Sequence, residues 1–243
     1  MRIPTPLLAA TALGVVVALV LGLLVAPADA VQGEAQRFMY LHVPAAWAAY
    51  LCIVGVVAAS AWYLARGGAK VWAFARAASE VGVAMTALTL LTGTVWGALT
   101  WGTWWAWDAR VMTTAAMGLV YLAHVALTAL ASPDGSRLAR VAAWTGVLGI
   151  VTVPLVHFSV VWWRTLHQPP TILAPGTGTP IDATMGIALV AGMISMLLIA
   201  CCAVVARTRA LTPRVVDAMP SSMSQSASSV VTSRGLPVAT RRA

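Results

Sequence analysis

Charged residues are scarce in this sequence of 243 residues, and this scarcity excludes an ordinary water-soluble domain. Asp, Glu, Lys and Arg make up 9% of the chain, whereas soluble domains carry roughly 25%. Hydrophobic residues make up 60%, and the mean hydropathy is +0.86. Because so little polar surface cannot cover a globule in water, the composition predicts an integral membrane protein.

Acidic residues are the rarer of the two charge types. The sequence has seven Asp and Glu residues and fifteen Lys and Arg residues, which gives a formal net charge of +8. A basic chain can indicate nucleic-acid binding, but no basic stripe lies on a water-facing domain, so we expect no nucleic acid as partner. The remaining explanation is the enrichment of Lys and Arg in the cytoplasmic loops of membrane proteins.

Several sequence motifs are also missing. The three cysteines, Cys52, Cys201 and Cys202, lie in apolar runs, as is typical of packing residues. No Cys-x-x-Cys-His run is present, so the chain carries no covalently attached c-type haem of its own. The sequence contains no P-loop motif, which excludes ATP hydrolysis by that route. No Ser/His/Asp, Cys/His or paired-carboxylate arrangement indicates nucleophilic or acid–base catalysis.

Six long apolar runs dominate the sequence, at residues 7–26, 43–65, 79–99, 112–131, 141–161 and 183–206. About 20 helical residues cross the ~30 Å hydrocarbon core of a bilayer. The predicted fold class is therefore all-α, with six transmembrane helices. We expect Pro44 to lie in the first turn of the second span and Pro154 to kink the fifth.

The basic residues divide unequally between the two sides that these spans define. One side receives nine: Arg2, Arg66, Lys70, Arg76, Arg137, Arg140, Arg207, Arg209 and Arg214. The other side receives Arg37, Arg110 and Arg164. The positive-inside rule then predicts both termini in the cytoplasm and three loops outside.

The first and last segments need separate interpretation. Ala28-Asp29-Ala30 resembles a signal-peptide cleavage site, but the apolar run before it is longer than the ~7–15 residues of a signal core, so we expect a retained helix. Residues 207–243 contain three prolines and a Ser-rich stretch at 221–229. We expect them to form a disordered cytoplasmic tail behind a six-helix domain at residues 1–206.

Tryptophan is concentrated in the second outer loop. Five of the eleven tryptophans lie within residues 96–110: Trp96, Trp101, Trp104, Trp105 and Trp107. A helix here would place three of them, at 101, 104 and 105, on one face with Asp108, while Arg110 would point away. An aromatic belt at the interface is the simpler interpretation, but a belt would divide Trp between both interfaces. We therefore favour a binding platform for a flat, conjugated ligand.

Two histidines lie on the same side as these tryptophans. His42 precedes the second span and His167 follows the fifth, whereas His157 lies one turn inside the fifth span and His124 lies deep in the fourth. A single interfacial His is usually only a polar cap. Two histidines on separate loops beside a Trp platform are suited to be the axial ligands of haem iron, because neutral imidazoles bind iron well.

The outer charges have several possible roles. Arg37, Arg110 and Arg164 are candidates to pair with the two haem propionates, because guanidinium groups match carboxylates, or else they are solvated loop residues. An acid near the interface is costly unless it is paired. Asp108 therefore holds Arg110, orients a histidine or fixes the loop on a partner protein, and the sequence does not choose among these.

Three segments resemble a known family. Residues 40–46 (YLHVPAA), 101–110 (WGTWWAWDAR) and 157–168 (HFSVVWWRTLHQ) resemble the haem exporter protein C (CcmC) family of system I cytochrome c maturation. Residues 96–110 resemble the tryptophan-rich "WWD" segment of haem-handling membrane proteins. The similarity extends over about residues 27–206, and larger haem-handling relatives carry many more spans.

This resemblance implies a role and its partners. The family presents haem at the outer face of the bacterial inner membrane, and the positions of His42 and His167 imply the two axial ligands. The WWD segment would hold haem b, bound transiently as a substrate, and would contact the periplasmic haem chaperone CcmE. The ABC subunits CcmA and CcmB then drive release of the chaperone, and the small membrane protein CcmD completes the assembly. His157 also matches a family histidine, without a ligand role.

Two other functions remain open at this stage. A haem permease would need polar groups along the spans, where Glu80, His124 and His157 are the ionisable candidates. An enzyme joining haem covalently to a partner would have to act by positioning alone, because the chain offers no obvious nucleophile. The sequence favours a haem-delivery subunit, not an enzyme, that captures haem at the outer leaflet.

Overall fold

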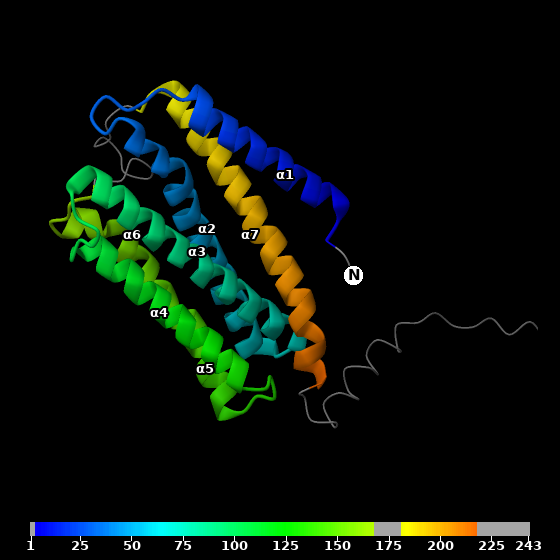
Figure 1. Ribbon diagram of the computed structural model, residues 1–243. Coiled ribbons are helices and arrows are strands. Elements are labelled where there is room, and N and C mark those ends of the chain that lie inside the picture. Colours follow the sequence, from blue (N-terminus) through cyan, green and yellow to red (C-terminus); the bar gives the residue numbers. More distant parts are fainter. Residues whose placement is uncertain (1–2, 168–180, 218–243) are drawn as a thin grey trace, which may run out of the picture.

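The computed structural model describes residues 3–167 and 181–217, and this part of the chain is a bundle of helices without strands (Figure 1). Its helices are α1 (Thr5–Val20), the π-helix η1 (Leu21–Val25), the 3-10 helix η2 (Glu34–Phe38), α2 (Met39–Arg66), α3 (Ala69–Trp101), α4 (Ala109–Leu130), α5 (Arg137–Leu148), the 3-10 helix η3 (Gly149–Val151), α6 (Thr152–Trp162) and α7 (Ala183–Asp217). Six helical segments are long and apolar enough to cross a membrane. The predicted all-α fold with six spans is confirmed, while the side on which the termini lie stays a prediction.

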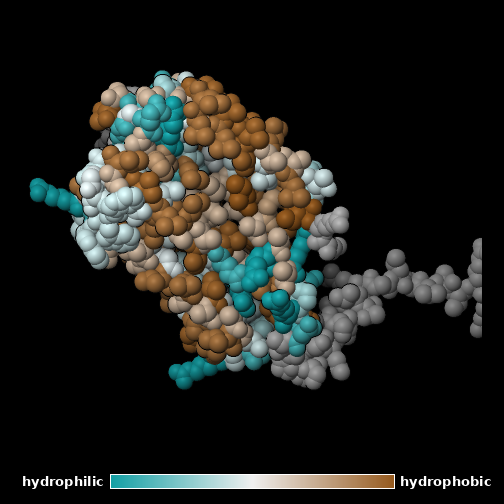
Figure 2. All heavy atoms as spheres, in the orientation of Figure 1, coloured by the Kyte–Doolittle hydropathy of each residue, from teal (hydrophilic) through white to brown (hydrophobic). Residues whose placement is uncertain are grey.

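Successive spans run in opposite directions, so the connections gather at two ends of the bundle (Figure 1). The end that carries residues 26–38, 102–108 and 163–167 is called the site end below, and the other is called the basic end. Figure 2 shows hydrophobic side chains over most of the visible surface, with hydrophilic ones concentrated towards the ends of the helices. This distribution is the one expected of a bundle surrounded by lipid.

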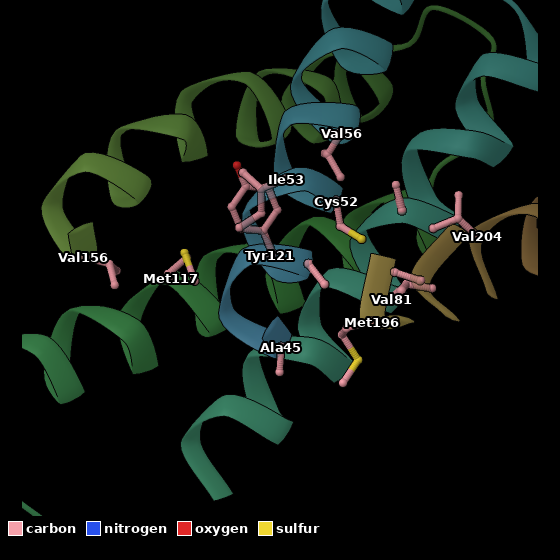
Figure 3. Packing of buried hydrophobic residues seen from close by; sticks show 13 residues of the cluster. Ala45, Cys52, Ile53, Val56, Val81, Met117, Tyr121, Val156, Met196 and Val204 are labelled. Carbon is pink, nitrogen blue, oxygen red and sulfur yellow. The ribbon is translucent and has the colours of Figure 1, made fainter. Parts of the chain in front are cut away.

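The buried core, where α2 packs on α3 and α7, combines small side chains with larger ones such as Ile53 and Tyr121 (Figure 3). Ala45 and Ala48 of α2 and Ala78 of α3 are 0–1% exposed in this core. Helices in a bilayer associate through van der Waals packing and short backbone distances rather than through the hydrophobic effect. The alanine-rich faces therefore allow the close helix contacts on which the site depends.

The prediction that Pro44 lies in a first helical turn is wrong, because α2 begins at Met39 and Pro44 lies inside it. Proline has no N–H, so the carbonyl of Tyr40 has no partner four residues later in the helix. Gly192 of α7 faces this point, and a Cβ built on it would lie 2.8 Å from the Tyr40 carbonyl oxygen. Gly192 therefore permits a backbone-to-backbone approach of α7 to α2.

Two predicted boundaries at the basic end are also wrong. α3 begins at Ala69 rather than at residue 79, and only Gly67 and Gly68, both with positive φ, separate it from α2. α7 continues as a helix through Asp217, so a disordered tail does not begin at 207, and residues 218–243 lie outside the described part. Both extensions are stabilised by burial, because Trp72 and Leu211 are 2% and 1% exposed in one shared cluster.

An ion-pair cluster adds to this contact between α3 and α7. Glu80 accepts hydrogen bonds from Arg76, at 3.0 Å, and from both Nε and Nη2 of Arg207. Glu80 is thus paired, which is how a carboxylate within a span is normally accommodated.

The predicted break at Pro154 is confirmed. The fifth span consists of α5 and α6, which are joined by the 3-10 turn of η3 at Gly149–Val151. Pro154 is the third residue of α6, and its missing N–H removes the hydrogen bond that would continue a regular helix through Ile150.

We expect Gly192→Ala to destabilise the bundle. The new methyl group would meet the Tyr40 carbonyl oxygen at 2.8 Å, and overpacking of this kind costs about 1–3 kcal/mol. Thermal unfolding in detergent should show a lower midpoint. Gly186→Ala on the same helix is the control, because its Cβ would meet only Ile181 Cγ2 at 3.9 Å. Equal midpoints for the two variants would contradict the close approach of α2 and α7.

Candidate functional site

A cavity at the site end lies between α2, α3, α4 and the segment that follows α6. It brings together residues from α2, α3, the connection 102–108, α4, α6 and the segment after α6. Those that carry chemistry are His42, Trp101, Trp104, Trp105, Arg110 and His167. The cavity extends into the bundle as far as Thr86 of α3 and Met117 of α4. The predicted grouping of both histidines with the tryptophan segment is therefore present in the fold.

His42 is held in place by residues of α3. Its Nδ1 lies 3.2 Å from the hydroxyl oxygen of Thr92, and its ring packs edge-on against Trp96, with centroids 5.7 Å apart. The ring also lies directly on Gly93, where a Cβ would meet His42 Cε1 at 2.9 Å. Trp96 is fixed in turn, since its indole N–H donates to Gln32 Oε1 at 2.8 Å. Trp96 thus supports His42 from behind and does not line the cavity.

The hydrogen bond to Thr92 determines the tautomer of a neutral His42. The Thr92 hydroxyl donates its single proton to the carbonyl oxygen of Leu88, at 2.7 Å. Its oxygen is therefore left to accept from His42, so Nδ1 carries the imidazole proton. The other ring nitrogen, Nε2, then has a free lone pair.

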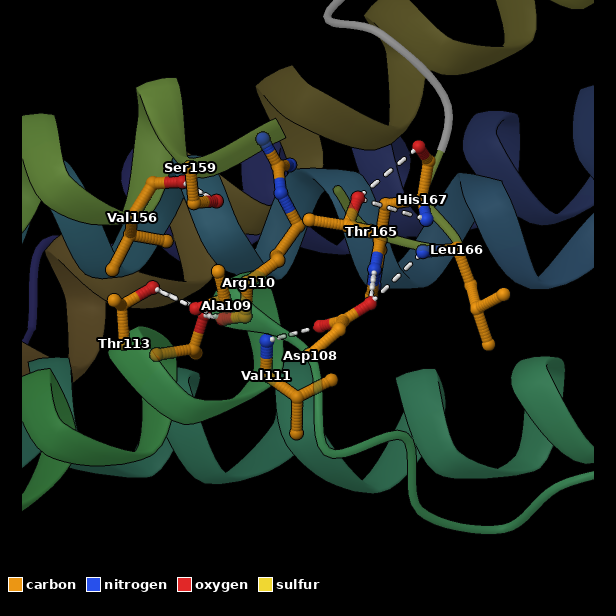
Figure 4. Close-up of polar contacts among 11 residues, drawn as sticks. Asp108, Ala109, Arg110, Val111, Thr113, Val156, Ser159, Thr165, Leu166 and His167 are labelled. Carbon is orange, nitrogen blue, oxygen red and sulfur yellow. Dashed lines mark hydrogen bonds and ion pairs between the residues drawn. The ribbon is translucent and has the colours of Figure 1, made fainter. Parts of the chain in front are cut away.

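His167 is held by Asp108 (Figure 4). Its Nδ1 lies 2.9 Å from Asp108 Oδ2, which also accepts from the backbone N–H of Leu166 at 3.2 Å. The other oxygen, Oδ1, accepts from the N–H of Val111 at 3.0 Å and caps the first turn of α4. Of the three roles that the sequence left open for Asp108, the structure thus shows the orientation of a histidine.

The ionisation of this pair follows from its surroundings. Burial lowers the pKa of His167, and the nearby Asp108 carboxylate offsets this only in part. Burial would raise the pKa of Asp108, but the hydrogen bonds from Val111 and His167 outweigh it, so the pKa of Asp108 lies below its ordinary value. At neutral pH a neutral imidazole therefore donates from Nδ1 to a carboxylate. His167, like His42, keeps an unprotonated Nε2.

Two hydrogen-bond donors of the cavity residues have no partner within residues 3–167 and 181–217. These are Nε of Arg110 and the indole nitrogen of Trp105, both buried. Arg110 uses Nη2 to donate to the backbone carbonyl of His157, at 2.9 Å. Buried donors without partners are costly. Their position beside a cavity is suited to a ligand with acceptor oxygens, such as a carboxylate.

The predicted helical face of the tryptophan segment is wrong. α3 ends at Trp101, because Gly102 adopts a left-handed conformation with φ of 71°, and residues 102–108 form a loop. Arg110 does not point away from the tryptophans, since it lines the same cavity. Trp104 and Trp107 are 68% and 80% exposed, so the loop presents aromatic rings on its outer surface.

The other two arginines lie outside the cavity. Arg37 pairs with Glu34 and donates to the carbonyl oxygens of Gly22 and Ala26, so it completes the end of the first span. Arg164 is exposed. Of the three predicted outer cations, Arg110 is the one that the fold brings to the two histidines.

His157 and His124 have other surroundings. The ring of His157 packs edge-on against Trp47, Tyr50 and Phe158, with centroids 4.9–6.5 Å apart. His124 is fully buried in α4, beside Tyr121. Neither residue lines the cavity.

The small residues that shape the cavity walls were not predicted from the sequence. Ala46 and Ala49 of α2 line it with Gly93 and Gly97 of α3. The Gly-x-x-x-Gly spacing of the two glycines is a signal that could have found this close contact, because such pairs mark helix interfaces in membranes.

The space enclosed by these residues is small, about 70 Å³. Sites for cofactor-sized ligands usually measure about 300–1,000 Å³. A large flat ligand can therefore enter only if part of the wall moves. Residues 102–107 are an exposed part of that wall, because Trp104 and Trp107 are 68% and 80% exposed, whereas Asp108 is anchored by Val111 and His167.

Comparison with known proteins connects this arrangement to a family. A family model described as "Heme exporter protein C" matches residues 1–219. The chain belongs to the heme exporter protein C family.

The protein named Heme exporter protein C of Bradyrhizobium diazoefficiens is 39% identical over 180 residues, which are 72% of this chain and 65% of that protein. The protein of that name in Escherichia coli K12 is 39% identical over 155 residues, or 60% of this chain and 59% of that protein. The protein of that name in Haemophilus influenzae is 38% identical over 160 residues, which are 64% of this chain and 63% of that protein. The similarity thus covers slightly less than two thirds of the length of each relative.

We expect Asp108→Asn to lower the pKa of His167 further below its ordinary value. The substitution removes the negative charge that favours the protonated ring, while burial remains. NMR of chains carrying ¹⁵N-labelled histidine would measure this pKa. Because Asn caps helices as well as Asp, the loss of stability should stay below about 1 kcal/mol. Asp134→Asn, at the opposite end of the bundle, is the control, and an unchanged pKa in Asp108→Asn would contradict the contact.

Proposed function

We propose that this chain binds haem between His42 and His167 and delivers it for the maturation of c-type cytochromes. One observation carries the proposal: both imidazoles line one cavity, and each has its Nδ1 engaged by a neighbour so that Nε2 is free. Haem iron takes four nitrogens from the porphyrin and accepts two axial ligands from the protein. Membership of the heme exporter protein C family supports haem as the substrate.

The remaining groups of the cavity fit the other parts of haem. Arg110 Nε and Trp105 Nε1 are buried donors without partners, and propionate oxygens are acceptors that suit them. The rings of Trp101, Trp104 and Trp105 offer aromatic surface to a porphyrin. Because the enclosed space is about 70 Å³, binding requires residues 102–107 to move outward while Asp108 stays in contact with His167. Haem b is then held as a transient substrate and not as a resident cofactor.

The residues of the site have distinct roles in this proposal. His42 and His167 bind the iron, and Thr92 and Asp108 hold their rings in the required tautomer. The chain supplies orientation and exclusion of water, and the iron supplies the affinity for imidazole. Since no reacting protein group is needed, we propose a haem-delivery subunit rather than an enzyme.

The proposed location and partners of the chain are based on its family and on the distribution of its basic residues. We place the site end at the periplasmic face of the bacterial inner membrane, because the basic residues gather at the opposite end. The exposed Trp104 and Trp107 offer a surface to the haem chaperone CcmE. CcmA, CcmB and CcmD complete the proposed assembly.

A haem path through the bilayer receives less support. The cavity begins at the loops of the site end, and its deepest residues, Thr86 and Met117, lie within the bundle. Glu80, nearer the basic end, is already paired with Arg76 and Arg207. Capture at the site end is therefore the better account.

We expect His42→Gly and His167→Gly each to abolish the bis-histidine absorption spectrum of haem bound to the purified chain. Exogenous imidazole should restore it, because it can occupy the space of the lost ring, and this rescue separates loss of a ligand from failure to fold. His157→Phe is the matched control, since it keeps an aromatic ring against Trp47 and Tyr50. An unchanged spectrum in the double variant would refute the ligand pair.

Gly93→Ala should weaken haem binding without removing a ligand. A Cβ at residue 93 would meet His42 Cε1 at 2.9 Å and displace the ring. We expect a loss of affinity of about tenfold, the lower end of the effect of disturbing the support of a metal ligand. Gly55→Ala is the control, because its Cβ would make ordinary contacts of 3.6 Å with Phe74. Haem titration of both purified variants measures the difference, and equal affinities would contradict the role of Gly93.

A further inference from the structure

A second cavity lies between α1, the beginning of α2 and α7, and it shares no residue with the site described above. Its volume is about 340 Å³. Its walls are almost entirely apolar, with Ala18 and Leu19 from α1, Leu41 from α2 and Ile199 from α7. It is therefore a groove for an apolar ligand.

This groove is open to the surroundings of the bundle. α1 packs on α7 at the edge of the structure (Figure 1), and only 6% of its apolar span is buried. Leu19 and Leu23, which line the groove, are 53% and 52% exposed. Figure 2 shows a largely hydrophobic surface in the region of α1. In a membrane, the molecules that meet this surface are lipids.

One end of the groove is polar, because Arg37 lines it near the site end. Its Nε donates to the carboxylate of Glu34, and its Nη1 donates to the carbonyl oxygens of Gly22 and Ala26, at 2.6 and 3.1 Å. Among residues 3–167 and 181–217, its Nη2 has no acceptor. The side chain of Glu34 is 71% exposed. A positive and a negative group thus lie side by side at the end of an apolar groove.

We propose that this groove binds one zwitterionic glycerophospholipid. An acyl chain lies between α1, α2 and α7, the phosphate accepts from Arg37 Nη2, and the headgroup ammonium pairs with Glu34. The charges match because the Arg37–Glu34 pair and the headgroup each carry one positive and one negative group. A lipid with a net negative headgroup would place no cation on Glu34. The proposal does not depend on haem binding.

The charged end of the groove favours a phospholipid over a transmembrane helix of another protein. Arg37 lines the groove and pairs with Glu34, whose side chain is 71% exposed. A partner helix that is apolar enough to cross the bilayer carries few charged residues that could meet this pair. A phospholipid combines apolar chains with charges of both signs, so it matches both parts of the groove.

Native mass spectrometry of the full chain extracted from vesicles tests the proposal. The vesicles contain equal amounts of phosphatidylethanolamine, phosphatidylcholine and phosphatidylglycerol. We expect one retained zwitterionic lipid, phosphatidylethanolamine or phosphatidylcholine, in preference to phosphatidylglycerol. Ala18→Phe fills the groove and should reduce its retention about tenfold. Ala12→Phe, on the same helix but outside the groove and exposed, should leave it unchanged.

A second variant tests the headgroup contact. Glu34→Gln removes the partner of the ammonium group, so the ratio of retained phosphatidylethanolamine to phosphatidylglycerol should fall about threefold, as expected for an exposed ion pair. Haem binding should be unchanged in all three variants. Equal retention in Ala18→Phe and Ala12→Phe would overturn the proposal, as would an unchanged ratio in Glu34→Gln. A copurifying polypeptide that Ala18→Phe displaces, without bound phospholipid, would also overturn it.

Discussion

The close approach of α2 to α3 is the constraint on which the rest of the structure depends. Ala45 and Ala48 are completely buried along α2, and Gly82 and Gly93 of α3 face Cys52 and His42, where added Cβ atoms would lie 3.2 and 2.9 Å away. Such distances are reached only between small residues. They place the His42 ring within hydrogen-bond distance of Thr92 and fix its tautomer. Helix packing thus determines the chemistry that this imidazole can offer.

Asp108 has the corresponding role on the other wall of the cavity. Its carboxylate accepts from Val111, Leu166 and His167, and the last two lie 58 and 59 residues further along the chain. One side chain therefore begins α4, anchors the segment after α6 and orients an imidazole. An acid near the membrane interface is costly unless donors surround it, and here three donors do so. The acid of the tryptophan-rich segment is thus explained by the positions that it fixes.

The sequence predicted the six spans, the break at Pro154 and the presence of both histidines at one end, because apolar length, proline chemistry and loop charge are local signals. It did not predict that α3 ends at Trp101, since a helix continued through Trp104 and Trp105 has equally good periodicity. Gly102 decides the matter by adopting a left-handed conformation. The direction of Arg110 was missed for the same reason. Its position depends on the start of α4 and on the carbonyl of His157, both set by tertiary contacts.

The arginines at the site end differ in what the fold leaves for them to bind. Arg37 uses Nε and Nη1 for Glu34 and two carbonyl oxygens of the first span and lies outside the cavity, whereas Arg110 lines the cavity and keeps a buried Nε without a partner among the described residues. Trp105 adds a second unpaired donor to the same cavity. Each such group costs about 1–3 kcal/mol, and these two lie beside a cavity, where an acceptor of a ligand can reach them. Their presence beside two imidazoles with free Nε2 atoms is explained most simply if a ligand with acceptor oxygens and a metal completes the site.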